Sequence, residues 1–138
     1  MAYEVSLIKA YSFSKNEIIE LFRDQRFFQL TGADTVETIF KVGGPFKLIF
    51  NNRGVISGHF VKISEDEIIL DWNVDGFEKP MEAGTIVTIK FERLGEGSKL
   101  KLDHTNIQHT EAAAAKKKAW TEILDNIESK LKNYQVVL

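Results

Sequence analysis

The amino-acid sequence predicts an α+β protein in which a curved antiparallel sheet of about seven strands wraps around a long C-terminal helix. Nearly every segment from Val36 to Ile107 has the pattern of a strand or a turn. The chain then continues into "EAAAAKKKAWTEILDNIESKLKNY", which contains no Gly or Pro. The apolar face of the sheet needs a long apolar element to cover it, so we expect the sheet to pack against this helix. We expect one domain that spans residues 1–138.

The first strand and two short helices are expected within residues 3–30. Residues 3–11 alternate loosely between apolar and polar side chains, as a strand does. Ser14 is followed three residues later by Glu17, which is typical of a capping box at the start of a helix. The segment "RFFQL" continues as a second short helix, and "TGAD" ends the helical region with a turn.

Six further strands are expected after these helices. They are "VETIFKV", "PFKLIF", "VISGHFVKI", "IILDWNV", "TIVTIKFERL" and "SKLKLDHTNI". The segment "NNRG" predicts a hairpin turn, "DGFEKPMEAG" a longer loop, and "GEG" a tight connection. In the second of these strands, Phe46, Leu48 and Phe50 share one face.

The C-terminal helix has one apolar side. Its apolar residues recur at three- and four-residue spacing, which is typical of an amphipathic helix. They are Trp120, Ile123, Leu124, Ile127 and Leu131. We expect this stripe to pack on the protein's own sheet, and the run Lys116-Lys117-Lys118 to lie on a solvated face.

The composition excludes several classes of function. The net charge of −2 and the pI near 5.9 argue against general nucleic-acid binding, which needs a positive field. The sequence has no cysteine, which excludes disulfides, thiolate metal sites and cysteine nucleophiles. No stretch has the apolar core of a signal peptide or the roughly 20 apolar residues of a membrane helix. We expect a soluble, cytoplasmic protein with no nucleic-acid partner and no integral membrane association.

The segment "KVGGPFKLIF" contains adjacent glycines, and a phosphate-binding loop is one possible reason for them. A phosphate loop leads from a strand into a helix, so that backbone amides face the anion. Here Gly43 and Gly44 lead into a strand, and Pro45 replaces an amide donor. We therefore expect a connection between strands, with a positive φ angle or a close backbone approach, and no nucleotide.

The histidines show no metal-ligand spacing. His59, His104 and His109 lack the paired arrangement of a metal site, so no metal is expected. No nucleophile, base and orienting group stand in a recognisable order, and no catalytic residue is assigned. In the strand alternation, Asp71 falls on the face opposite Trp72, toward solvent.

Several stretches together resemble a known superfamily. They are "VGGPFKL", "SGHFVKI" followed by "IILDW", "TIVTIKFE" followed by "GSKLKLDHTNI", and "KKKAWTEILDNIESKL". In this order they are similar to the START-like superfamily, also called SRPBCC or Bet v-like. Within it, the chain resembles the AHSA-like family, the activators of heat-shock chaperone ATPase and their small bacterial relatives. The resemblance implies a helix-grip fold with a cavity between the sheet and the last helix.

The chain departs from the family pattern at two places. Relatives commonly have a Trp close to the end of the early helices, where this chain has Phe27, Phe28 and Leu30. Ala119-Trp120 replaces a frequent Gly-Trp pair. The resemblance implies no single reaction, because the superfamily includes carriers, receptors, cyclases and chaperone regulators.

We predict that a small hydrophobic or amphipathic molecule, lipid-like or polyketide-like, binds noncatalytically between the sheet and the C-terminal helix. The residues expected to line the cavity are Phe46, Leu48, His59, Val61, Trp72, Val87, Ile89, Phe91, Leu100, Leu102, His104, Trp120, Leu124 and Ile127. No cofactor is expected. A competing interpretation is that these side chains fill the space completely, as protein interiors tend to do.

Two other functions remain open. The family resemblance implies a co-chaperone-like module that binds a chaperone or another protein through its exterior. The other alternative is a cavity enzyme in which His59 or His104 supplies the polar group.

Overall fold

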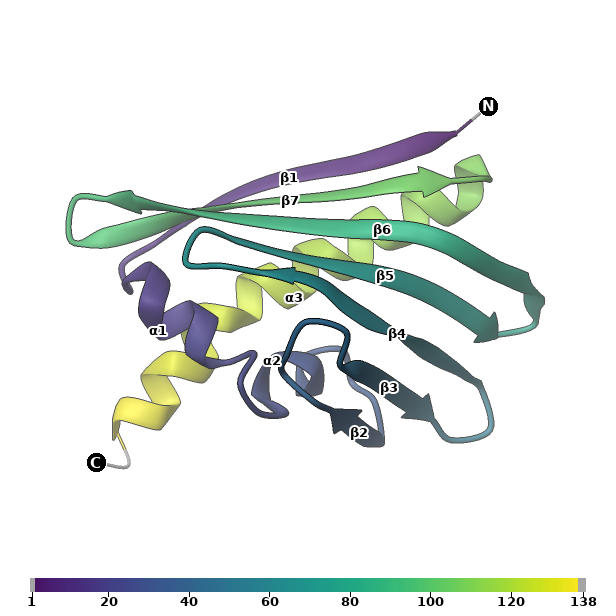
Figure 1. Ribbon diagram of the computed structural model, residues 1–138, viewed down its shortest axis with the longest axis horizontal. Helices are drawn as coiled ribbons and strands as arrows, with labels where there is room; N and C mark the ends of the chain where they lie inside the picture. The colour runs from purple at the N-terminus through teal and green to yellow at the C-terminus, as the bar shows by residue number, and fades with distance from the viewer. Residues whose placement is uncertain (1, 137–138) are drawn as a thin grey trace.

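The computed structural model describes residues 2–136, with side chains described as far as residue 132. In chain order the elements are β1 (Tyr3–Tyr11), α1 (Lys15–Glu20), α2 (Arg26–Gln29), β2 (Thr35–Thr38), β3 (Pro45–Phe50), β4 (Gly54–Ile63), β5 (Glu67–Gly76), β6 (Lys79–Leu94), β7 (Gly97–Ile107) and α3 (Thr110–Val136). Figure 1 shows α3 crossing one face of a curved sheet, with α1 and α2 near the second half of α3. This arrangement confirms the predicted helix-grip fold.

The seven strands form one antiparallel sheet in the order β1-β7-β6-β5-β4-β3-β2. Strands β2 to β7 pair with their neighbours in the chain, and β1 pairs with β7 at the far edge. This order requires few crossing connections, because most strands follow one another through hairpins. The predicted number of strands and their order along the chain are confirmed.

The capping box before α1 is present. The Ser14 hydroxyl accepts a hydrogen bond from the Glu17 backbone N–H at 3.2 Å, and the Glu17 carboxylate accepts one from the Ser14 N–H at 3.4 Å. These bonds satisfy two donors that the first helical turn leaves free. The helix therefore begins where the sequence predicts.

The double glycine is a connection between strands, as predicted. Gly43 has a φ of +82°, and its N–H donates to the Phe60 carbonyl at 2.7 Å. A Cβ on Gly44 would lie 2.2 Å from the Ile39 carbonyl oxygen, so no larger residue fits there. This connection also shortens β2 to four residues, because the chain after Thr38 turns toward β4.

The prediction of a long loop over "DGFEKPMEAG" is wrong. Gly76 pairs directly with Lys79, and the two residues between them, Phe77 and Glu78, both have a φ of 57°. These angles are those of a type I′ hairpin turn, whose twist matches that of the flanking strands. The sequence hides this turn because such positions normally carry Asn or Gly rather than Phe and Glu.

Aromatic rings pack between the sheet, α2 and the middle of α3. Phe28 stacks on Phe46 with 4.9 Å between ring centroids, and Phe46 lies 5.3 Å from Trp72. Trp72 in turn lies 5.1 Å from Trp120 of α3. This end of the protein is therefore a packed core, to which α1 contributes Ile18, α2 contributes Phe27 and Phe28, and the turn between them contributes Phe22. Among the described residues, no helix is long and apolar enough to span a membrane.

Candidate functional site

A pocket of about 770 Å³ opens between the first half of α3 and the ends of β4, β5 and β6. Its apolar wall includes Phe50, Ile56, Trp72, Val74, Phe77, Met81, Trp120 and Ile123. This volume lies within the roughly 300–1,000 Å³ that is typical of small-molecule sites. The space between the sheet and α3 is thus packed at one end and open at the other.

Small side chains on α3 leave this space open. The helix presents Ala112, Ala115 and Ala119 to the pocket, whereas further along it presents Leu124 and Ile127 to the core. An alanine side chain reaches too short a distance to fill the gap between a helix and a sheet. The change from alanine to large residues along α3 therefore determines where the pocket ends.

Glu82 reaches the pocket because β6 contains a β-bulge. Trp72 pairs with Thr85 and Val74 pairs with Glu82, so two steps along β5 match three steps along β6. The extra residue reverses the alternation of side chains and turns Glu82 to the inner face. Gly84 adopts the required φ of +79°, and its N–H donates to the Asn73 Oδ1 at 2.9 Å.

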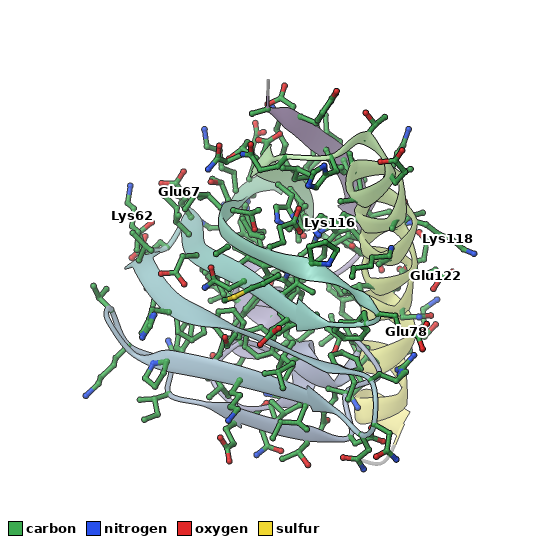
Figure 2. The ribbon with its side chains drawn as sticks, turned by 90° about the vertical axis from the view of Figure 1, so that its right-hand side faces the viewer. Lys62, Glu67, Glu78, Lys116, Lys118 and Glu122 are labelled. Atoms are coloured by element: carbon green, nitrogen blue, oxygen red, sulfur yellow. The ribbon has the colours of Figure 1, made fainter. Side chains whose placement is uncertain are left out.

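Lys116 of α3 forms an ion pair with Glu82 on the pocket wall. The two side chains are only 15% and 11% exposed, respectively. In Figure 2 Lys116 points toward the sheet, whereas Lys118 and Glu122 point away from it. The expectation that the whole lysine run is solvated is therefore wrong for Lys116, which lies one turn before Trp120 on the inner side of the helix.

His104 is fully buried behind Trp120 and does not itself line the pocket. The Trp120 indole N–H donates to the His104 Nδ1 at 3.0 Å, and the His104 Nε2 lies 2.9 Å from the Thr85 hydroxyl. An indole nitrogen can only donate, so the His104 proton lies on Nε2 and is donated to Thr85, which donates to the Trp72 carbonyl. Burial, together with the charge of Lys116, lowers the pKa of His104 to about 3.

The outer rim of the pocket carries positive charge. The Arg53 guanidinium lies 5.4 Å from the Phe50 ring centroid and 6.0 Å from the Phe77 ring centroid, within the range of cation–π interactions. Lys79 is a second cation among the lining residues, Glu111 is an anion, and His109 also lines the pocket. The site therefore combines an apolar body, one charged pair inside, and a mostly cationic entrance.

Comparison with known proteins identifies the family. The model of the activator of Hsp90 ATPase homolog 1-like proteins matches residues 12–132. The chain belongs to this family. Among curated proteins, none matches the sequence significantly.

Solved structures of similar proteins share this fold. An Hsp90 activator from Plasmodium falciparum is 28% identical, with a TM-score of 0.73 and coverage of 96% of both chains. The Aha1 dimer from Colwellia psychrerythraea is 18% identical, with a TM-score of 0.74 and coverage of 91% of this chain and 93% of that one. An uncharacterized protein from Rhizobium leguminosarum is 15% identical, with a TM-score of 0.79 and coverage of 96% and 97%.

Of the predicted cavity residues in this Hsp90-activator-like chain, Trp72 and Trp120 line the pocket. Ten others lie in the buried interior without lining it, where they pack against one another. These are Phe46, Leu48, Val87, Ile89, Phe91, Leu100, Leu102, His104, Leu124 and Ile127.

The expectation that His59 and Val61 face the cavity is wrong. Val61 is 51% exposed, and the side chain of His59 is 59% exposed. A β-bulge between Phe60 and Lys62 changes the alternation, so Phe60 and Ile63 face inward although they are three residues apart. On the outer face, the Asp71 carboxylate accepts a hydrogen bond from the His59 backbone N–H at 2.8 Å.

The sequence analysis missed the polar residues of the pocket. Glu82 was assigned to a loop, Lys116 to a solvated run, and Arg53 to a turn. The spacing of Lys116 from Trp120 could have placed it on the inner side of the helix, but no local signal predicts the position of Glu82. In the part of the chain with described side chains, no cluster of three or more His, Cys, Asp or Glu is arranged to hold a metal ion.

Proposed function

We propose that this protein is a noncatalytic START-like domain that binds a small hydrophobic or amphipathic molecule in the pocket beneath the first half of α3. The observation that carries the proposal is a space of about 770 Å³ beside a core that is otherwise tightly packed. Its walls are mainly apolar, with a few polar groups at defined positions, which is the usual character of a ligand site.

The driving force for binding is the burial of apolar ligand surface. This contributes about 25 cal/mol per Å² before the entropic costs of association. Trp120 on the pocket wall is held by its hydrogen bond to His104, which in turn binds Thr85, so this side chain does not have to become ordered when a ligand enters.

Native mass spectrometry of freshly purified protein and a thermal-shift screen of lipid-like and polyketide-like compounds test this proposal. The variant Ala119→Phe places a ring in the pocket and should abolish the shifts that wild type shows. Ala114→Phe is the matched control, because Ala114 lies on the exposed side of the same helix and does not line the pocket. Equal shifts in wild type and Ala119→Phe would place binding elsewhere, and no shift at all would refute the proposal.

A second function, binding of a chaperone or another protein through the exterior, has support of its own. The family description and the Hsp90 activator from Plasmodium falciparum point to it. Ile39, Val42 and Val61 are 51%, 63% and 51% exposed, and backbone hydrogen bonds between Gly43, Gly44 and Phe60 bring their segments together. Stimulation of Hsp90 ATPase by wild type, and its loss in Val42→Lys, would favour this function over ligand carriage.

A cavity enzyme has the least support. His104 is neutral, and both of its ring nitrogens are engaged by Trp120 and Thr85. His59 lies on the opposite face of the sheet, away from the pocket. A cytoplasmic location also belongs to the proposal and is tested by fractionation of cells that express the chain.

A further inference from the structure

The ion pair on the pocket wall has unused hydrogen-bonding capacity. A carboxylate accepts about four hydrogen bonds, and a lysine ammonium group donates three. The Glu82 Oε1 is bound to Lys116, but the Glu82 Oε2 is buried and has no hydrogen-bond partner among the described residues. A buried oxygen without a partner is costly, and both side chains line the pocket. The pair therefore offers a ligand one acceptor and further N–H donors at the same place.

The charges around the pair limit which ligand group can use this capacity. A ligand carboxylate that binds Lys116 would also lie against the like charge of Glu82, and a ligand ammonium group that binds Glu82 would also lie against Lys116. A neutral hydroxyl avoids both repulsions and buries no additional charge. It can donate to the Glu82 carboxylate and accept from the Lys116 ammonium group.

We propose that the pocket selects apolar ligands that carry a neutral hydroxyl group, an alcohol or a phenol, which Glu82 and Lys116 bind together. This inference rests on the proposed function, because it requires that the pocket bind a small molecule. It names the polar group of that molecule and the two side chains that recognise it.

Fluorescence titration at pH 7 with three matched probes tests the inference. The probes are pyrenemethanol, pyrenecarboxylate and pyrenemethylammonium, which share one apolar body and differ in the polar group. Wild type should bind the alcohol at least about 10-fold more tightly than either charged probe, because the alcohol alone can hydrogen-bond to both Glu82 and Lys116, and one hydrogen bond to a charged group has about that effect on affinity. In Glu82→Gln the carboxylate probe should gain affinity from the unpaired Lys116, and the preference for the alcohol should fall below about 2-fold.

Lys118→Met and Glu122→Gln are the control variants. Both residues lie on the exposed side of α3 and point away from the sheet (Figure 2), so the preference among the probes should not change. If Glu82→Gln does not fold, Glu82→Leu combined with Lys116→Met removes the pair without leaving a buried charge alone. That double variant should bind pyrenemethanol about 10-fold more weakly than wild type does.

The outcomes separate this inference from the proposed function. If wild type binds the carboxylate probe as tightly as the alcohol, or if the alcohol preference survives in both Glu82 variants, the inference is overturned while ligand binding stands. If wild type binds none of the three probes, the inference is overturned, and if it also fails the broader compound screen, the proposed function is refuted as well.

Discussion

The two halves of the space between α3 and the sheet are built differently, although one helix and one sheet form both. Near α1 and α2 the space holds stacked aromatic rings, with Phe46 in contact with Phe28 and Trp72. Beneath the first half of α3, alanines face the hairpin end of the sheet and leave about 770 Å³ open. The packed half holds the helix against the sheet, and the other half contains the pocket in which we propose that a ligand binds. The comparison indicates that side-chain packing is concentrated at one end of the same interface.

The largest expected effect is the loss of a ring from the packed half. Phe46→Ala should lower the free energy of unfolding by about 3–5 kcal/mol, because it leaves a cavity among Phe28, Phe60 and Trp72. Phe50→Ala is the matched change at the pocket, where part of the ring already faces open space, and it should cost clearly less. Urea denaturation measures both values. Equal losses would show that the two halves do not differ in packing.

Acid should lower the free energy of unfolding through His104, which lies between the packed half and the pocket. Its pKa is about 3 in the folded protein and near 6.5 in the unfolded chain, so the unfolded state binds more protons between these values. The contribution of His104 to the free energy of unfolding is complete above pH 6.5. It decreases by about 1.4 kcal/mol for each pH unit below that value, until about pH 3.

Stability curves of wild type and His104→Gln between pH 8 and pH 4 measure this effect. Residue 104 of the variant cannot gain a proton in this range, so the stability of the variant should fall less steeply with pH than that of wild type. Parallel curves for the two proteins would contradict the assignment of the acid sensitivity to His104.

A smaller effect is expected at the bulge that turns Glu82 inward. Gly84→Ala places a Cβ at a φ of +79°, where the nearest other atom is the Asn106 Nδ2 at 3.9 Å. The substitution meets no steric obstacle, so its cost is the backbone strain alone, about 1–2 kcal/mol. Thermal denaturation measures this cost. A loss much larger than this would indicate that the residue contributes more than its conformation.

The smallest effect is expected where α3 covers the pocket. Ala115→Leu adds a large side chain next to open space, so the free energy of unfolding should change by less than about 0.5 kcal/mol. Urea denaturation provides the value, and ligand-induced shifts should decrease in the same variant. A strong destabilisation would mean that this half is already filled.

The fold was largely predictable because its signals are local. The capping box at Ser14, the alternation in the strands and the apolar stripe of α3 each follow from neighbouring residues. The turn at Gly43 was predictable for the same reason, since a glycine pair before a strand limits the possible conformations.

The candidate site was less predictable because it depends on pairing between distant segments. The bulges near Val61 and Gly84 change which residues face inward, and nothing in the adjacent sequence specifies them. The void is a difference between the available space and the total side-chain volume, which no single residue reveals. Trp72 and Trp120 were placed correctly on the inner face because large aromatic residues on two facing elements tend to meet in the interior.

The alanines of α3 have a second consequence. Alanine has the highest intrinsic preference for the helical state, so "EAAAA" favours a helix even where tertiary contacts are few. The part of α3 beside the pocket makes few packing contacts, so its helical structure depends more on its own backbone hydrogen bonds. The alanines that leave the pocket open therefore also favour the helical state of the segment that covers it.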